Sequence, residues 1–313
     1  MDGAIVIDKP AGITSHDVIA RVRKIVGERR VGHTGTLDPF ATGVLVVLVG
    51  RATRLAQFLS GAEKEYETVI RLGFATDTGD ATGNPVREFV AEAQTITELR
   101  REEIETAMAS LRGEIEQTPP MYSAKKIAGR RLYEYARRGE EVDRAPIHVN
   151  IKTFELLSND CFLDDNENIP SDVRARVVCS AGTYVRTLAE DLGRKLGVGA
   201  HLAGLRRTRA GNFRIEDAIT LDKLSKWAET ESTASVSISP NDALCHLPSM
   251  QLPVDDAIRA GHGIELPVSS DSVTTWSDGQ AVRLCRENDL IAVARYDASR
   301  QAAHPFVVLA SVE

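Results

Sequence analysis

The chain has 313 residues, enough for one large domain or two unequal ones. Its hydrophobic share of 42% and charged share of 27% are ordinary for a soluble globular protein, and no apolar run approaches the roughly 20 residues of a transmembrane helix. The acidic start is unlike a signal peptide, and the four cysteines are dispersed without a Cys-x-x-Cys pair. We therefore expect a cytoplasmic protein with reduced thiols and no metal site.

The net charge of −7 hides an uneven distribution along the chain. Residues 174–214 carry nine basic and two acidic side chains, and residues 123–144 carry seven basic and four acidic ones. By contrast, residues 222–313 carry seven basic and thirteen acidic side chains. Two basic segments in an otherwise acidic chain favour a surface for a polyanion, although solvated helix faces are the alternative.

Hydrophobic periodicity predicts mixed strands and helices in the first half of the chain. A helix capped by Thr14 or Ser15 is expected, because the apolar residues that follow recur at helical spacing up to Val26. The other predicted elements are strands at 4–8, 44–49 and 65–72, a turn-rich loop at 77–85, and helices at 52–59 and 97–111.

The second half of the sequence predicts further strands and helices, followed by short β-like runs near the C-terminal end. The predicted elements are a basic helix at 131–138, strands at 147–157 and 173–179, a helix ending at 196, and short β-like runs at 281–284, 290–295 and 306–309. Residues 159–172 are acidic and Asn-rich, so we expect an exposed loop, and residues 229–242 are Ser/Thr-rich and patternless, as in a linker. Together these elements predict an α+β fold with a small, mostly β C-terminal module.

The loop from His33 to Gly43 contains the most informative chemistry. Asp38 precedes Pro39, and the residue before a proline is displaced from helical geometry, so its carboxylate lies on a defined bend. A carboxylate held by rigid backbone can act as an acid, a base or a nucleophile. The alternative is an Asp-Pro turn that only introduces the next strand.

Three more segments carry unusual chemistry for their position. They are Lys64-Glu65-Tyr66 at a strand start, the stiff basic segment 119–126, and Gly182-Thr183-Tyr184-Val185-Arg186 at a helix start. An arginine in the first turn of a helix opposes the helix dipole, so Arg186 should have a carboxylate or phosphate partner.

These segments, in this order, resemble the TruB-type tRNA pseudouridine synthases. The resemblance covers about residues 3 to 222 and rests on the segments 3–15, 32–43, 64–66, 120–124, 182–186 and 205–207. It implies a pseudouridine synthase catalytic domain at 1–228, with a mixed, largely antiparallel sheet and flanking helices. A linker at 229–242 and a small PUA-like RNA-binding domain at 243–313 would follow. The implied activity is conversion of uridine 55 in the T arm of tRNA to pseudouridine.

The resemblance also implies roles for three candidate catalytic residues. Asp38 matches the catalytic aspartate and must be ionised, either to attack the ribose anomeric carbon or to take a proton from the sugar. Arg186 matches the arginine that pairs with this carboxylate, and such a contact should hold the pKa of Asp38 down. Tyr66 matches the tyrosine that stacks on the target base, and its hydroxyl is available for the final deprotonation at C5.

The target uridine lies inside a folded RNA arm and must be flipped out. His33 matches a histidine associated with the flipped nucleotide, so we assign it to binding rather than to proton transfer. The other candidate RNA-binding residues are Arg54, Lys125, Arg130, Tyr184, Leu205 and Arg206. For Arg206 and Arg207, support of the sheet and contact with the RNA backbone both remain open.

No cofactor or metal is implied, because the isomerisation consumes none and the chain has no nucleotide-binding motif. We expect tRNA as the partner and a monomer as the working form. The alternatives are a non-catalytic tRNA-binding or folding protein, a guide-RNA-dependent pseudouridine synthase, and an enzyme acting on free nucleosides. The short acidic C-terminal region disfavours the guide-dependent type, and the basic segments disfavour the free-nucleoside enzyme.

Overall fold

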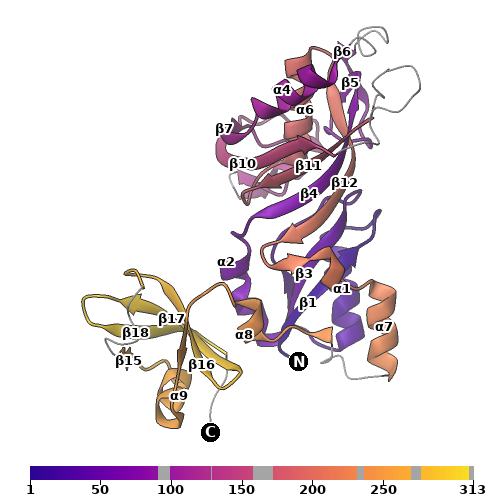
Figure 1. Ribbon diagram of the computed structural model, residues 1–313. Coiled ribbons are helices and arrows are strands. Elements are labelled where there is room, and N and C mark those ends of the chain that lie inside the picture. The colour runs from indigo at the N-terminus through magenta and orange to yellow at the C-terminus, as the bar shows by residue number, and fades with distance from the viewer. Residues whose placement is uncertain (91–98, 128, 158–171, 231–235, 269–275, 310–313) are drawn as a thin grey trace.

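A large mixed sheet forms the centre of the computed structural model, which describes residues 1–90, 99–127, 129–157, 172–230, 236–268 and 276–309 (Figure 1). In sheet order its strands are β1 (Gly3–Lys9), β3 (Thr42–Val49), β12 (Ala200–Ala210), β4 (Lys64–Leu72), β11 (Asp172–Cys179), β10 (Ile147–Leu156) and β7 (Gly113–Gln117). The short strands β2 (Val31–His33) and β13 (Phe213–Arg214) extend β3 and β12. All these pairs are antiparallel except β3 with β12, so the predicted α+β fold with a mixed, largely antiparallel sheet is confirmed.

Helices cover both ends of this sheet. The longer ones are α1 (Ser15–Val26), α4 (Arg101–Ala109), α6 (Val185–Leu196) and α7 (Leu221–Thr230). The short ones are the 3₁₀ turns η1 (Gly50–Leu55) and η2 (Ile215–Asp217), and the helices α2 (Ala56–Leu59) and α5 (Leu132–Ala136). Two hairpins complete this part, β5 (Phe74–Thr76) with β6 (Pro85–Val90) and β8 (Lys126–Ile127) with β9 (Arg130–Arg131).

Side-chain alternation on β1 explains how its two faces build two cores. Ile5 and Ile7 pack with α1 and α7, whereas Ala4 and Val6 pack on the opposite face. Thr14 is the N-cap of α1 and forms a capping box with Asp17, which resolves the choice between Thr14 and Ser15. At the other end of the sheet, α4 and α6 share a third core with β10 and β11.

The parallel contact between β3 and β12 brings distant segments together. Gly43 lies opposite Arg207 in this pair, and Arg207 lies opposite Tyr66 in the neighbouring pair of β12 with β4. The loop that precedes β3 is therefore next to the start of β4. Asp38 and Tyr66 meet in this way although 27 other residues separate them along the chain.

A second sheet of five strands forms the C-terminal part, and it confirms the expected small, mostly β module. Its order is β14 (Ser249–Gln251), β16 (Ala281–Arg286), β17 (Asp289–Asp297), β18 (Ala302–Val308) and β15 (Leu266–Pro267), with α9 (Val254–Gly261) packed against it. Cys285, Val293 and Val307 from this sheet join the core that contains Ala4 and Val6, so the two sheets share a hydrophobic contact.

The described residues of the segment 229–242 form more regular structure than the composition of the segment indicates. The helix α7 continues to Thr230, Ile238 exchanges backbone hydrogen bonds with Ala4, and α8 (Pro240–Ala243) follows. Most of the acidic loop predicted at 159–172 lies outside the described residues, as does the start of the helix predicted at 97–111. Among the described residues, no helix is both long and apolar enough to cross a membrane.

Candidate active site

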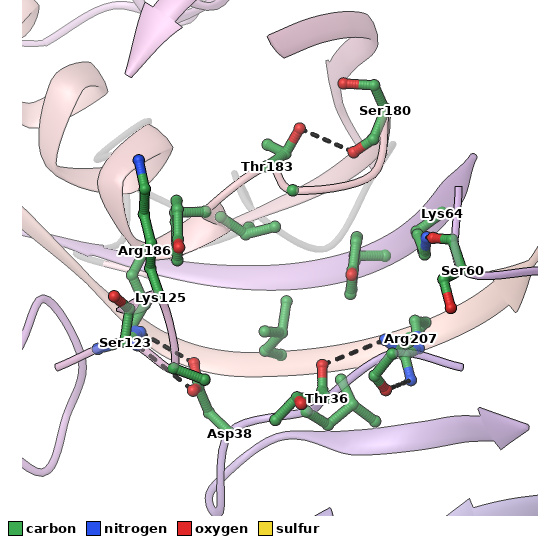
Figure 2. A pocket seen from close by; sticks show the side chains of 18 of the residues that line it. Thr36, Asp38, Ser60, Lys64, Ser123, Lys125, Ser180, Thr183, Arg186 and Arg207 are labelled. Carbon is green, nitrogen blue, oxygen red and sulfur yellow. Dashed lines mark hydrogen bonds and ion pairs between the residues drawn. The ribbon is translucent and has the colours of Figure 1, made fainter. Parts of the chain in front are cut away.

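A polar pocket lies where the 33–43 loop meets the start of β4, the middle of β12 and the start of α6 (Figure 2). Loop residues before α5 and α6 form the rest of its wall. The lining residues include Gly35, Thr36, Asp38, Ser60, Lys64, Tyr66, Ser123, Lys125, Ser180, Thr183, Tyr184, Arg186, Leu205 and Arg207. All three candidate catalytic residues line this pocket.

Asp38 and Arg186 form an ion pair in this pocket. Arg186 Nε lies 2.9 Å from Asp38 Oδ2, and Nη2 donates to Oδ1 at 3.3 Å. The guanidinium also donates to the carbonyl oxygens of Thr78 and Tyr122 at 2.8 and 2.7 Å. The side chain of Arg186 is only 5% exposed, whereas that of Asp38 keeps 32%. Arg186 is therefore fixed, and it holds the more accessible carboxylate toward the pocket.

A second carboxylate, Asp80, lies behind this pair. Its Oδ2 is 3.7 Å from Arg186 Nη1, and its side chain is 7% exposed. Its Oδ1 accepts hydrogen bonds from the Thr82 amide and from the Thr78 and Thr82 hydroxyls. Asp80 lies in the turn-rich loop predicted at 77–85, and the sequence did not indicate a role for it. The many turn-forming residues around Asp80 were the one sequence feature that could have indicated a carboxylate accepting hydrogen bonds within a turn.

The pKa of Asp38 corrects one expectation. Burial raises this pKa above its ordinary value, contact with Arg186 opposes the rise, and the nearby charge of Asp80 adds to it. Arg186 lowers the pKa of Asp38 as predicted, but it does not hold the pKa down overall, because desolvation outweighs the single counter-charge. Asp38 becomes ionised at a higher pH than a free aspartate does.

Three buried side chains fix the backbone of the Asp38 loop. The Lys9 ammonium donates to the carbonyl oxygens of Pro10, Pro39 and Ala41. The Ser15 hydroxyl accepts from the Leu37 amide and donates to its carbonyl. Arg207 donates to the carbonyl oxygens of Val44, Gly35 and Thr36, so the structure assigns it to loop support. The carboxylate of Asp38 is thus presented by a loop that is bonded on both sides.

Tyr66 and Lys64 share one face of β4 and both line the pocket. Tyr66 is 8% exposed, and burial raises the pKa of its phenol although Arg207 opposes the rise. Lys64 is 7% exposed, and its ammonium donates to the Ser60 carbonyl oxygen at 2.6 Å. Burial and the charge of Arg207 lower the pKa of Lys64 to about 8. Lys64 belongs to the Lys64-Glu65-Tyr66 motif, but the sequence did not indicate a role for it.

The candidate RNA-binding residues fall into two groups. Tyr184, Leu205 and Lys125 line the pocket. His33 adjoins it at the end of β2, where its ring meets that of His16 at 5.8 Å between centroids. Burial lowers the pKa of His33, as do the charges of His16 and Arg207. His33 is therefore neutral at physiological pH, which fits a stacking or hydrogen-bonding contact.

Three other candidates lie outside the pocket lining. Arg54, in η1, donates to the Val308 carbonyl oxygen and so links η1 to β18 of the C-terminal sheet. Arg206 pairs with Asp8 through two contacts of 3.1 and 2.8 Å, so its guanidinium has a protein partner. Arg130 is an exposed residue of the β8–β9 hairpin. Within the described part of the chain, no three His, Cys, Asp or Glu side chains form a potential metal-binding group.

Comparisons with known proteins identify the family. The model of the TruB family pseudouridylate synthase N-terminal domain matches residues 23–185, and that of the tRNA pseudouridylate synthase B C-terminal domain matches residues 186–259. A protein of Heliobacterium modesticaldum named tRNA pseudouridine synthase B is 40% identical over 94% of this chain and 90% of its own length. A Bacillus cereus protein of the same name is 44% identical over 88% and 89%.

Solved structures agree with this assignment. The structure titled "Crystal Structure of a Cbf5-Nop10-Gar1 Complex" matches with a TM-score of 0.71 and 28% identity, over 98% of this chain and 85% of that one. A structure of an H/ACA RNP bound to a substrate RNA containing 2′-deoxyuridine matches with the same TM-score and 26% identity, again over 98% and 85%. This chain belongs to the TruB family of pseudouridine synthases.

Proposed function

We propose that this protein converts uridine 55 in the T arm of tRNA to pseudouridine, as a cytoplasmic monomer without a cofactor. The observation that carries the proposal is the Asp38–Arg186 ion pair in a pocket that Tyr66 also lines. The relatives named tRNA pseudouridine synthase B support tRNA as the substrate class.

The proposed reaction moves the uracil from one ring atom to another. The N1–C1′ bond breaks, and its electron pair leaves with the uracil. The C5–C1′ bond then forms, C5 loses its proton, and N1 gains one. Positive charge develops on the ribose when the first bond breaks, so an ionised Asp38 favours this step both as a nucleophile at C1′ and as a base toward the sugar.

Arg186 and Tyr66 have supporting roles in this scheme. Arg186 orients Asp38 by contacting both carboxylate oxygens with a fixed, forked set of donors. Tyr66 stacks on the flipped uracil. Because burial raises the pKa of its phenol, Tyr66 is protonated at neutral pH and serves the C5 step by relaying the proton rather than by accepting it as a phenolate.

The proposed tRNA surface follows from the positions of the candidate residues. His33, Tyr184 and Leu205 contact the flipped nucleotide, and Lys125 and Arg130 contact backbone phosphates. Arg54 and Arg206 contribute less to binding, because their guanidinium groups are engaged by Val308 and Asp8. The catalytic domain comprises residues 1–228, residues 229–242 connect it, and residues 243–313 form a PUA-like domain that contacts another part of the tRNA.

One experiment tests the proposal directly. Purified protein is incubated with an unmodified tRNA transcript that carries tritium at C5 of its uridines, and both tritium release and the position of pseudouridine are measured. We expect conversion of one T-arm uridine, which Asp38→Asn abolishes while tRNA binding persists. Asp222→Asn, an exposed carboxylate on α7, is the matched control and should retain full activity.

The same experiment separates the alternatives. Tight tRNA binding without conversion by the unaltered protein would favour a non-catalytic binding protein. Conversion only after addition of a guide RNA would favour the guide-dependent type. Conversion that survives Asp38→Asn would overturn the assignment of the catalytic carboxylate.

A further inference from the structure

Lys64 is a buried cation for which the described residues supply no buried counter-charge. Its side chain lines the pocket, the residue is 7% exposed, and the hydrogen bond of its ammonium goes to a neutral backbone carbonyl, that of Ser60. No ion pair joins Lys64 to a carboxylate among the residues that the structure describes. A buried ammonium in this situation bears most of its desolvation cost, which an anionic ligand would relieve.

The other buried cations of the site have partners. Arg186 is paired with Asp38 and lies near Asp80, and Arg207 is engaged by three carbonyl oxygens of the Asp38 loop. Lys9 also donates to three carbonyl oxygens. Of the two lysines, Lys9 uses all three N–H donors of its ammonium, whereas among the described residues the Lys64 ammonium uses one, on Ser60, and lines the pocket.

The two ends of the pocket differ in charge. Figure 2 shows Asp38, Arg186 and Lys125 at one end, where the carboxylate lies, and Lys64 with Ser60 and Arg207 at the other, which has no carboxylate among the lining residues. Tyr66 lies two residues from Lys64 on the same face of β4, so a base stacked on Tyr66 would present an edge to the ammonium. A ribose at Asp38 and a uracil at Tyr66 would place the developing positive charge near the carboxylate and the uracil toward Lys64.

We propose that Lys64 is a catalytic residue that stabilises the negative charge on the departing uracil. When the N1–C1′ bond breaks, its electron pair passes to N1 and spreads over the O2 and O4 oxygens. The Lys64 ammonium donates a hydrogen bond to one of these oxygens, and this contact strengthens as the charge grows. No proton transfer from Lys64 is required, so it remains an ammonium throughout. This inference rests on the proposed function.

A charge that acts on the transition state changes the rate more than the affinity. We expect Lys64→Met to lower the single-turnover rate constant of pseudouridine formation about 100-fold at saturating enzyme, the loss typical of one such donor. The dissociation constant for a T-arm stem-loop RNA should change less than threefold. Lys64→Arg should recover much of the rate because it keeps the charge, whereas Lys64→Gln should not.

Two controls distinguish a catalytic role of Lys64 from a general effect of removing a lysine or of lost stability. Lys152→Met removes a lysine on β10 whose side chain is 71% exposed and pairs with Glu63, and it should leave both rate and affinity unchanged. Thermal unfolding should show Lys64→Met and Lys64→Gln to be at least as stable as the unaltered protein, because each removes a buried charge.

Two results with the Lys64→Met protein would contradict the inference. A Lys64→Met protein that loses affinity but keeps its rate at saturation would assign Lys64 to a ground-state contact such as an RNA phosphate, and would overturn the inference. An unchanged rate would overturn it as well. Both outcomes leave the proposed function intact, since the unaltered protein still forms pseudouridine. Absence of conversion by the unaltered protein would instead overturn the proposed function, and the inference with it.

Discussion

Arg186 Nε lies 2.9 Å from Asp38 Oδ2, and the same guanidinium donates to the carbonyl oxygens of Thr78 and Tyr122. This fork of contacts needs the planar geometry of arginine. Arg186→Lys should therefore lower kcat about 100-fold, because a lysine keeps the charge but loses the parallel donors.

The check is a comparison of kcat and KM between two lysine variants. Arg176→Lys replaces an arginine on β11 that pairs with Glu65 and Glu155 outside the pocket, and it should retain near-normal activity. Equal activities of the two variants would show that the forked geometry at Arg186 is dispensable.

Asp80 should influence the pH dependence of the reaction. Its charge raises the pKa of Asp38, and the proposed chemistry requires Asp38 to be ionised. Asp80→Asn removes this charge, so the pKa of Asp38 falls and the acidic limb of the rate profile moves to lower pH. We also expect kcat to fall about tenfold near neutral pH, because Arg186 loses a neighbour that orients it.

The measurement is kcat/KM for the T-arm RNA between about pH 4 and pH 8, since burial raises the pKa of Asp38 above its ordinary value. RNA affinity should be unaffected, because Asp80 is buried and is not among the residues that line the pocket. An acidic limb that stays in place or moves to higher pH would contradict the electrostatic link between the two carboxylates.

Asp38 and Asp80 also show which parts of the site can be predicted from the sequence. The position of Arg186 in the first turn of a helix indicated an anionic partner, and the Asp-Pro bend indicated a fixed carboxylate at Asp38. No local sequence pattern indicated that Arg186 and Asp38 would be in contact, because this contact depends on β12 lying between β3 and β4. The position of Asp80 beside Arg186 was not predicted for the same reason, because the sequence of a turn-rich segment does not show which of its side chains is buried.

The fold was predictable where an element is apolar throughout or on one face. The strand from Val44 to Val49 and the helix capped by Thr14 follow from burial and capping rules. The hairpin of β8 and β9 was not predicted, because two-residue strands carry no periodic signal. The pairing of Ile238 with Ala4 was also missed, since composition alone makes this Ser/Thr-rich segment resemble a free linker.

The close approach of Gly43 to Arg207 predicts a large loss of stability. Gly43 has φ +98°, and an added Cβ would overlap the backbone carbonyl of Arg207 and lie 2.8 Å from its nitrogen. Gly43→Ala should therefore lower the free energy of unfolding by about 3 kcal/mol or more, because both strain and overlap fall on β3 and β12, which position the Asp38 loop.

Gly12→Ala is the matched control for this change. Gly12 also has a positive φ, +83°, but nothing lies within 4 Å of its added Cβ. Only the left-handed conformation is then penalised, which costs about 1–2 kcal/mol. Urea denaturation measures both variants, and similar losses at the two glycines would refute the argument from the backbone approach.

Lys125 and Arg206 should respond differently to removal, although both are candidate RNA contacts. Lys125 lines the pocket and forms no ion pair among the described residues, whereas Arg206 is held by Asp8 at 2.8 and 3.1 Å. Lys125→Ala should weaken T-arm RNA binding and reduce the slope of log Kd against log salt by about one, as expected for one lost phosphate contact.

Arg206→Ala should leave this slope unchanged and lower the free energy of unfolding by about 1 kcal/mol, since it breaks a half-exposed pair. Titrations at several salt concentrations measure the slope, and a reduced slope for Arg206→Ala would show that Arg206 contacts the RNA backbone despite its bond to Asp8.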